Sequence, residues 1–145
     1  MKNHAASKNC KRGSRQRRLI LDTVRSGALG HPTAAEVYDA VRGKMPNISL
    51  GTVYRNLSSL ASDGEISRLD LGDLSRFDCD TSEHSHFACK KCGAIFDVRI
   101  RPSARRGLLS SLGGGFSADS ASVLFSGYCP KCSKKLQPNT KENRL

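Results

Sequence analysis

The sequence predicts an α+β chain in two parts, an N-terminal winged helix-turn-helix unit and a small C-terminal α/β unit with a zinc site made of four cysteines. Three observations predict this fold class. Residues 16–62 contain three stretches with helical apolar periodicity, and two short β-like stretches follow them. Two CxxC motifs are separated by 36 residues in the second half. Basic residues gather at the N-terminus, where eight of the first 25 residues are Lys or Arg and only Asp22 is acidic.

The first half of the chain is predicted to form three helices and a hairpin. The first helix covers residues 16–26, with Leu19, Ile20 and Val24 on one face. The second covers residues 34–42 and begins with a capping box formed by Thr33 and Glu36. The third runs from residue 50 to about 62 behind the N-cap Ser49, and its expected inward side chains are Leu50, Val53, Leu57 and Leu60. Residues 66–71 and 75–78, joined through Gly72 and Asp73, predict a hairpin, so the whole unit matches a winged helix.

The third helix carries the side chains that are expected to read DNA. No acid occurs between Ser49 and Ser62, although solvated helix faces usually mix charges of both signs. Arg55 suits a guanine edge, Asn56 an adenine edge or a phosphate, and Tyr54 a phosphate or a thymine methyl group. The alternative for Tyr54 is a core position. The complete set of predicted DNA-binding residues is Arg15, Arg17, Arg18, Thr52, Tyr54, Arg55 and Asn56.

Net charge and hydropathy restrict the partners. The chain has 24 basic and 13 acidic residues, a net charge of +11. A basic arm that leads into a folded unit is typical of nucleic-acid binders, although a solvated tail is the alternative. We find no signal-peptide pattern and no apolar run that approaches the ~20 residues of a membrane span. The expectation is therefore a cytoplasmic protein with reduced thiols, with no membrane partner and no small-molecule substrate.

The second half is predicted to form a small α/β unit. Residues 94–99 and 121–128 suggest strands, residues 103–112 a short helix, and Gly113–Gly115 a turn. The predicted organisation is a basic flexible arm at 1–14, the winged helix at 15–78, and a hinge at 79–83. A metal-binding unit then follows at 84–135, with a flexible tail at 136–145.

The two CxxC motifs predict a structural zinc site. Four thiolates in two such pairs, Cys89, Cys92, Cys129 and Cys132, suit tetrahedral Zn²⁺. A thiol switch is the alternative, but it requires one CxxC at a helix start after a strand. Cys10 and Cys79 are expected to be unligated, and Cys10 to be open to oxidation if the arm is exposed.

A second set of side chains predicts a different metal. The set consists of histidines and carboxylates: His31, Asp78, His84, His86 and Asp97. Alternate residues of a strand point the same way, so His84 and His86 can ligate one ion together. Imidazoles and carboxylates suit Fe²⁺, Mn²⁺ or Zn²⁺. A polar hinge without a metal is the alternative.

The chain resembles the ferric uptake regulator superfamily from about Arg15 to Cys132. The motifs that carry the resemblance are His31-Pro-Thr-Ala-Ala-Glu-Val-Tyr, Ser49-Leu-Gly-Thr-Val-Tyr-Arg-Asn-Leu57, Arg76-Phe-Asp78, His84-Ser-His86-Phe-Ala-Cys89-Lys-Lys-Cys92-Gly and Cys129-Pro-Lys-Cys132. This resemblance implies a homodimeric, metal-dependent repressor that binds a palindromic DNA operator and is not an enzyme. It also implies that the C-terminal unit is the dimerisation domain, with one structural Zn²⁺ and one regulatory Fe²⁺ or Mn²⁺ per subunit.

The carboxylates favour the peroxide-sensing branch of that superfamily. Iron and zinc sensors usually carry Glu at one or both positions matching Asp78 and Asp97, whereas the peroxide branch resembles this chain in having Asp at both. The resemblance then implies that peroxide oxidises His31 and His84 when Fe²⁺ is bound. The alternative is an iron- or zinc-responsive uptake repressor. Iron sensors often keep a third site with a Glu in the helix at 103–112, which has no acid here.

Two functions outside the superfamily fit the sequence less well. A zinc nucleobase deaminase requires His-x-Glu and a following Pro-Cys-x-x-Cys, but this chain has His84-Ser-His86 and its Pro130 lies inside the second CxxC motif. A plain zinc-ribbon interaction module leaves the helical half and the histidine–carboxylate set unexplained.

Overall fold

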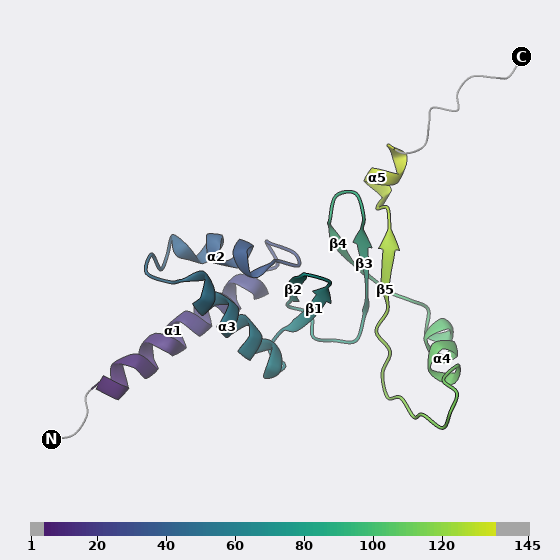
Figure 1. Cartoon of the computed structure of the whole chain (residues 1–145), viewed down its shortest axis with the longest axis horizontal. Coiled ribbons are helices and arrows are strands. Elements are labelled where there is room, and N and C mark those ends of the chain that lie inside the picture. Colours follow the sequence, from purple (N-terminus) through teal and green to yellow (C-terminus); the bar gives the residue numbers. More distant parts are fainter. Residues whose placement is uncertain (1–4, 136–145) are drawn as a thin grey trace, which may run out of the picture. The chain divides into compact units, whose positions relative to one another are not determined.

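The computed structural model describes residues 5–135, with side chains from residue 15 onward. The chain divides into two compact units between Thr81 and Ser82. The first contains α1 (Ala5–Arg25), α2 (Ala34–Arg42), α3 (Leu50–Ser62), β1 (Ser67–Leu71) and β2 (Leu74–Asp78) (Figure 1). The second contains β3 (Ser85–Cys89), β4 (Ile95–Val98), α4 (Pro102–Ser110), β5 (Leu124–Gly127) and α5 (Pro130–Lys134). The predicted α+β class is confirmed, with a winged helix-turn-helix followed by an α/β unit.

Helix α1 begins much earlier than the sequence pattern predicts. It starts at Ala5, so the predicted start at Gln16 is wrong. Residues 5–14, expected to be a flexible arm, form the first turns of this helix in the structure. The physical reason is that Ala and Lys favour helix here, and the single Gly13 costs only about 1 kcal/mol inside one. Residues 1–4 and the predicted tail at 136–145 lie outside the described part of the chain.

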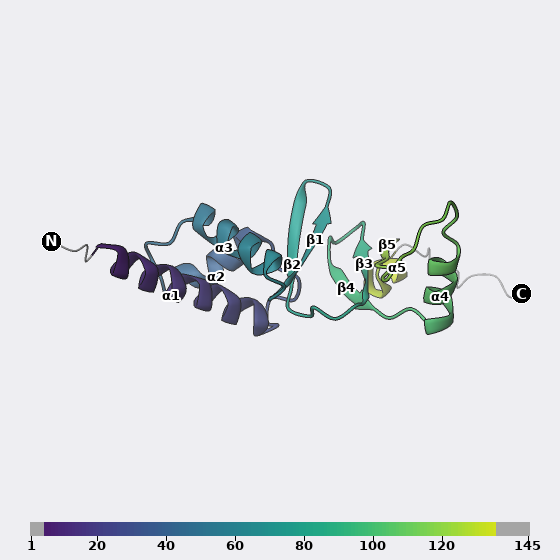
Figure 2. The ribbon, with the colours of Figure 1, turned by 90° about the horizontal axis from the view of Figure 1, so that it is seen from below.

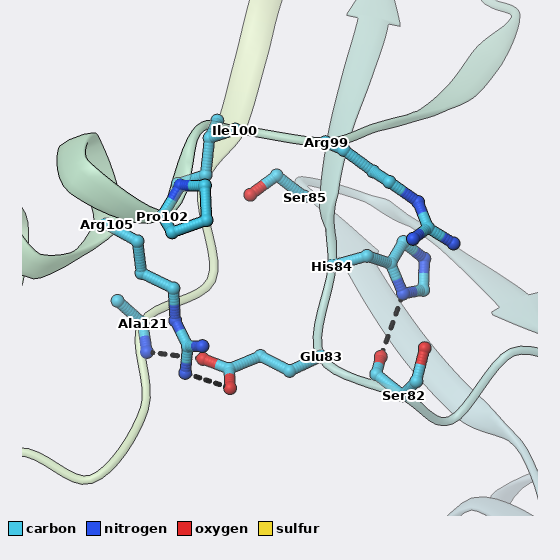
Figure 3. Close-up of a pocket in the computed structure, with 9 residues that line it drawn as sticks. All are labelled: Ser82, Glu83, His84, Ser85, Arg99, Ile100, Pro102, Arg105 and Ala121. Atoms are coloured by element: carbon cyan, nitrogen blue, oxygen red, sulfur yellow. Dashed lines mark hydrogen bonds and ion pairs between the residues drawn. The ribbon is translucent and has the colours of Figure 1, made fainter.

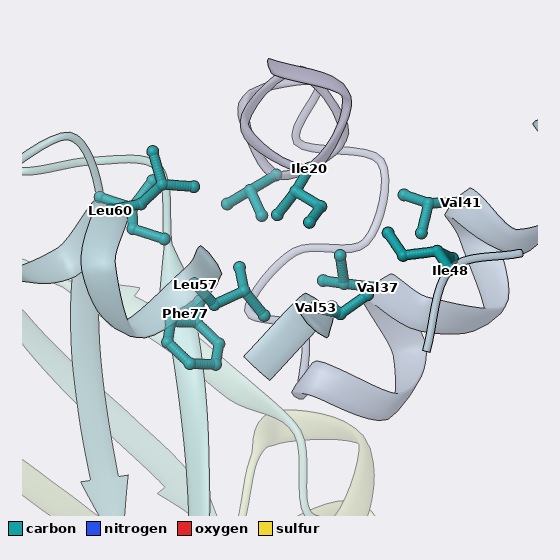
Figure 4. Close-up of a cluster of buried hydrophobic side chains, with 10 residues drawn as sticks. Ile20, Val37, Val41, Ile48, Val53, Leu57, Leu60 and Phe77 are labelled. Atoms are coloured by element: carbon teal, nitrogen blue, oxygen red, sulfur yellow. The ribbon is translucent and has the colours of Figure 1, made fainter. Parts of the chain in front are cut away.

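The helices of the first unit enclose an apolar core (Figure 4). Its buried side chains are Ile20, Val24, Val37, Val41, Ile48, Val53, Leu57, Leu60, Ile66 and Phe77. Burying one such side chain contributes about 1.5–3 kcal/mol. Val53, Leu57 and Leu60 follow the predicted helical period, but Leu50 is 47% exposed, so its predicted inward position is wrong. Leu50 is the first residue of α3 and precedes the first buried position by about one turn.

Both predicted helix caps are present. The Thr33 hydroxyl accepts from the Glu36 backbone N–H at 3.2 Å, and the Glu36 carboxylate accepts from the Thr33 backbone N–H at 2.7 Å. The Thr33 N–H is also the main reason why the pKa of Glu36 lies below its ordinary value. At α3, the Ser49 hydroxyl accepts from the Thr52 N–H at 3.1 Å. These bonds satisfy backbone donors that a helix start otherwise leaves unpaired.

We expect Thr33→Ala to lower the free energy of unfolding by about 1 kcal/mol, because it removes one cap hydrogen bond. Urea denaturation measures this change. Thr33→Ser keeps the hydroxyl and serves as the matched control, with a smaller expected loss. Equal unfolding free energies for the two variants would show that the cap adds no stability.

The hairpin of the first unit brings its last residue to the start of α2. Strands β1 and β2 are antiparallel, with Ser67 opposite Asp78 and Leu71 opposite Leu74 (Figure 2). Gly72 begins the two-residue turn with φ of +69°, a conformation that glycine adopts without strain. The Phe77 N–H donates to the Pro32 carbonyl at 2.9 Å. This contact ties the segment before α2 to the end of β2.

The second unit is built on a three-stranded sheet in the order β4-β3-β5. Strand β3 is antiparallel to β4, with His86 opposite Asp97, and parallel to β5, with Cys89 opposite Gly127. The predicted strands are present but shorter. Helix α4 ends at Ser110, so Leu112 lies beyond it, contrary to the predicted helix. Helix α5, a single turn that begins at Pro130, was not predicted.

The second unit has a thin core. Within residues 82–135 as described, the buried cluster consists of Cys89, Cys129 and Cys132, with Phe87 packed against it. Helix α4 buries no residue. The large apolar side chains left exposed are Phe96, Leu108, Leu112, Phe116, Leu124, Phe125 and Tyr128. Units of this size with so little burial rely on bound metal or on association for stability.

Across residues 5–135, no helix combines the length and the apolarity that a membrane span requires.

Candidate metal centres

The parallel pairing of β3 and β5 brings the two CxxC motifs together. Cys89 ends β3, and Gly127 stands opposite it near the end of β5. The Lys90 N–H donates to the Gly127 carbonyl at 2.7 Å and holds the two strand ends side by side. The Sγ atoms of Cys89, Cys92, Cys129 and Cys132 all lie within 4.8 Å of one another. This spacing suits four ligands around a single ion.

The electrostatics of the cysteine cluster favour a bound cation. The Cys129 N–H donates to Cys89 Sγ at 3.3 Å, and this donor is the first cause that lowers the pKa of the Cys89 thiol. Burial, followed by the neighbouring thiols, raises the pKa of Cys132. Four thiolates cannot share so small a space without a compensating positive charge. A divalent ion supplies that charge and binds thiolates directly, so the residues present fit Zn²⁺.

The remaining cysteines have different environments. Cys79 is half-buried and packs against the apolar core of the first unit. Among the cysteines with described side chains, all are free of disulfides. The side chain of Cys10 lies outside the described part of the chain. The prediction that Cys79 is unligated agrees with its place in an apolar core.

In the first unit, His31 and Asp78 form a buried pair. His31 Nε2 lies 3.4 Å from Asp78 Oδ2, and the side chains are 8% and 5% exposed. Arg76 donates to the His31 carbonyl at 2.8 Å, which fixes the chain just before α2. The Asp80 N–H donates to Asp78 Oδ1 at 2.8 Å, so the carboxylate is held from behind. A histidine and an aspartate far apart in sequence are thus brought together with little freedom.

In the second unit, His84, His86 and Asp97 form another set. Asp97 Oδ1 lies 3.3 Å from His84 Nε2 and 3.6 Å from His86 Nε2. The two imidazole rings are 4.3 Å apart between centroids. His84 Nδ1 donates to the Ser82 carbonyl at 2.8 Å, so the neutral ring has its lone pair on Nε2, the nitrogen nearer Asp97. A second nitrogen fixed in this way is typical of metal-ligating histidines.

A cavity of about 380 Å³ lies beside His84 (Figure 3). Glu83 points into it and accepts from two elements: the Arg105 guanidinium of α4 and the Ala121 N–H, at 2.9 Å, ahead of β5. The Glu83 side chain therefore holds the backbone directly before His84 in place and anchors α4, which buries no residue. The sequence pattern did not identify Glu83. An acid directly before a His-x-His motif was the available signal, but its partners come from segments far along the chain.

The predicted DNA-binding side chains of α3 differ in their surroundings. Tyr54 is 43% exposed, so the alternative that placed it in the core is wrong. Arg55 is also exposed and donates to the Thr52 hydroxyl at 3.2 Å. Asn56 is half-buried and donates to the Thr52 carbonyl at 2.9 Å. The outward surface of α3 therefore centres on Tyr54 and Arg55.

The predicted DNA-binding side chains of α1 also differ in whether they are exposed or engaged within the unit. Arg15 and Arg18 are exposed. Arg17 instead donates to Asp63 at 2.5 Å and to the Ser59 hydroxyl at 2.8 Å, which joins α1 to the end of α3. Its guanidinium is engaged within the unit, whereas the charges of Arg15 and Arg18 face solvent.

Comparison with known proteins gives consistent matches along most of the chain. Residues 8–109 match the model of the family described as the ferric uptake regulator family. The peroxide operon regulator of Bacillus subtilis is 38% identical over 121 residues, which cover 83% of each chain. The peroxide-responsive repressor PerR of Staphylococcus aureus is 35% identical over 83% of this chain and 81% of its own. The crystal structure of the Campylobacter jejuni peroxide stress regulator matches with a TM-score of 0.69 and 27% identity, over 88% of this chain and 96% of its own.

Proposed function

The chain belongs to the ferric uptake regulator family, and we propose that it is a metal-dependent DNA-binding repressor that responds to hydrogen peroxide. One observation carries the proposal. Both histidine–carboxylate sets, His31–Asp78 and His84–His86–Asp97, are assembled within their own units, and both use aspartate. The relatives that share 35–38% identity are named for their response to peroxide, which supports the same conclusion.

We propose that the cysteine cluster holds a structural Zn²⁺, one per subunit. The four Sγ atoms and the cysteine pKa directions described above support this assignment. The zinc would join the end of β3 to the start of α5 and stabilise a unit that buries few apolar side chains. A dimer of such units would also cover part of the exposed apolar surface, which includes Phe125 and Tyr128. We place dimerisation there for this reason.

We propose that the two histidine–carboxylate sets bind one regulatory Fe²⁺ or Mn²⁺ together. His84, His86 and Asp97 alone have the two-histidine, one-carboxylate composition that binds Fe²⁺, and His31 and Asp78 would add two ligands of types that these ions also accept. His31 and Asp78 belong to the first unit, and His84, His86 and Asp97 to the second. Shared binding would therefore favour one arrangement of the first unit relative to the second unit of the same chain. Because the second unit is proposed to form the dimer, the same ion would also set the spacing of the two DNA-binding units. That is the differential interaction that coupling of metal binding to DNA binding requires.

The response to peroxide depends on the ligand histidines. A bound Fe²⁺ would promote the reductive cleavage of hydrogen peroxide, which Mn²⁺ would not. Over the whole reaction one ring C–H of an imidazole becomes C–OH (the tautomer of the 2-oxo ring), two electrons pass from the ring to the peroxide, and the second peroxide oxygen leaves as water. His31 and His84 are the imidazoles expected to gain oxygen. An oxidised ring cannot keep both its ligand nitrogen and its supporting bonds, such as that from His84 to Ser82. The affinity for metal would then fall, and the repressor would leave a palindromic operator in the cytoplasm.

We expect His31→Ala to abolish metal-dependent binding to operator DNA, because it removes the imidazole of the first unit. Zinc content and dimerisation should be unchanged, since the cysteine cluster lies in the other unit. Electrophoretic mobility shift with and without Mn²⁺, metal analysis and sedimentation measure the three properties. His4→Ala changes the histidine outside the ligand set and is the control. Loss of zinc in His31→Ala would contradict the assignment of two separate sites.

A further inference from the structure

Arg68 joins the wing hairpin to the helix that is proposed to read DNA. Arg68 lies on β1, and its Cζ is 5.9 Å from the centre of the Tyr54 ring on α3. A guanidinium within about 6 Å of an aromatic face is attracted by the ring. Tyr54 is exposed, and a tyrosine side chain has two rotatable bonds that a neighbour can restrict. Arg68 is therefore placed to restrict that ring.

The guanidinium is itself held from the hairpin. Arg68 Nε donates to Asp70 at 2.8 Å, and Arg68 NH2 donates to the Ser75 hydroxyl at 2.9 Å. The Ser75 hydroxyl donates in turn to Asp70 at 2.7 Å, and Asp70 and Ser75 are opposite each other on β1 and β2. The hydrogen bond from Ser75, and then that from Arg68, lower the pKa of Asp70, which therefore stays ionised. Both strands of the wing thus hold one guanidinium in place.

The charge balance of this network argues against a phosphate contact. An arginine that neutralises a DNA phosphate needs its positive charge available. Here an ionised carboxylate already lies against Arg68, and that carboxylate would repel phosphates if Arg68 moved away. The sum of the charges of Arg68 and Asp70 is close to zero. A role of Arg68 in holding the Tyr54 ring explains these features better than a role in attracting DNA phosphates.

We infer that Arg68, fixed by Asp70 and Ser75, is a positioning residue that orients Tyr54 for sequence-specific recognition of operator DNA. The inference rests on the proposed DNA-binding function. A Tyr54 ring that is already restricted loses less conformational freedom when it contacts a base edge. The hairpin, held to α3 through Arg68, would also approach DNA in a fixed position relative to that helix. Arg68 then contributes to the discrimination between DNA sequences and little to non-specific affinity.

The test compares two duplexes of equal length in the presence of Mn²⁺. One is the duplex that the wild-type protein selects from a randomised pool, and the other is its scrambled version. Arg68→Lys keeps the charge but lacks the planar fork that donates to Asp70 and Ser75 at once. We expect it to reduce the preference for the selected duplex about three- to tenfold. Affinity for the scrambled duplex and the salt dependence of binding should stay unchanged.

A double-mutant cycle with Tyr54→Leu isolates the pair. In the Tyr54→Leu background, Arg68→Lys should have no further effect on discrimination. Ser75→Ala, which removes one hydroxyl, should give a smaller loss in the same direction and is the variant least prone to disturb folding. Arg15→Ala is the contrasting control, since loss of an exposed charge should weaken both duplexes alike.

Three outcomes would overturn the inference. One is unchanged discrimination in Arg68→Lys. Another is an equal loss of discrimination on Arg68→Lys in the wild-type and Tyr54→Leu backgrounds. The third is a lower salt dependence on Arg68→Ala, which would make Arg68 a phosphate contact. A wild-type protein that selects no duplex would overturn the proposed function as well, whereas the other outcomes leave that function intact.

Discussion

Fe²⁺-loaded protein treated with one equivalent of hydrogen peroxide is expected to gain one oxygen atom on His31 or His84 and to release its operator DNA. Both rings belong to the sets proposed to hold the iron, with His31 Nε2 near Asp78 and His84 Nε2 near Asp97. The family resemblance, rather than this geometry, selects them over His86. Peptide mass spectrometry identifies the oxidised residue. Fluorescence anisotropy of a labelled duplex follows the release, which should be nearly complete.

The Mn²⁺-loaded protein is the matched control, and it should keep both its mass and its DNA. The same comparison separates the proposed function from an iron- or zinc-responsive repressor. Release by peroxide without a mass gain on either histidine would contradict the proposed chemistry. Equal behaviour of the Fe²⁺ and Mn²⁺ forms would favour a sensor of metal availability. Both forms must be prepared from chelator-treated protein, because such sites bind Zn²⁺ more tightly than Fe²⁺ or Mn²⁺.

Cys129→Ser is expected to remove the zinc and to unfold most of the second unit. Cys129 is buried, and the substitution removes one of the four Sγ atoms that lie within 4.8 Å of one another, so only three thiols remain. Structural zinc contributes about 10–16 kcal/mol in small zinc-finger peptides, far more than the thin core of this unit can replace. We expect the zinc content, measured by metal analysis, to fall from one ion per chain to none. Circular dichroism should show loss of sheet, and sedimentation should show monomer.

Cys79→Ser is the matched control for that experiment. Cys79 packs against the core of the first unit and lies outside the thiol cluster. We expect it to keep its zinc, its dimer and its sheet, with a modest loss of stability in the first unit. If Cys129→Ser protein still retained one zinc per chain after a chelator treatment that empties the histidine–carboxylate site, the cysteine cluster would not be the zinc site.

The sequence was most informative where local rules decide the structure. Caps at Thr33 and Ser49 and the apolar period of α3 depend on residues a few positions apart, so their placement was predicted correctly. The pairing of the CxxC motifs followed from ligand chemistry alone, and the structure brings the four Sγ atoms together as expected. The residue types alone placed His31 in the second ligand set, and the resemblance to a family added its expected oxidation.

The features that were missed depend on contacts between distant segments. Glu83 acquires its role from Arg105 and Ala121, which are 22 and 38 residues away. The contacts of Arg17 to Asp63 and Ser59, 46 and 42 residues away, were not predicted either, while its predicted role in DNA binding stays a prediction. The start of α1 was wrong because the sequence offers no strong helix stop before residue 16. The predicted inward position of Leu50 was wrong because periodicity predicts which face of a helix is buried, but not at which residue the packing begins.

The order of the strands also sets the order in which the protein can mature during its synthesis. The first unit is complete once Asp78 has been made, whereas β3 obtains its parallel neighbour only with β5, and the thiol cluster is complete only with Cys132. At usual translation rates the interval between the two is about 3–11 s. During that time a nascent chain holds a complete first unit, but neither the complete thiol cluster nor the full sheet of the second unit. Newly made repressor is therefore expected to reach its operator only after the last thiols have left the ribosome.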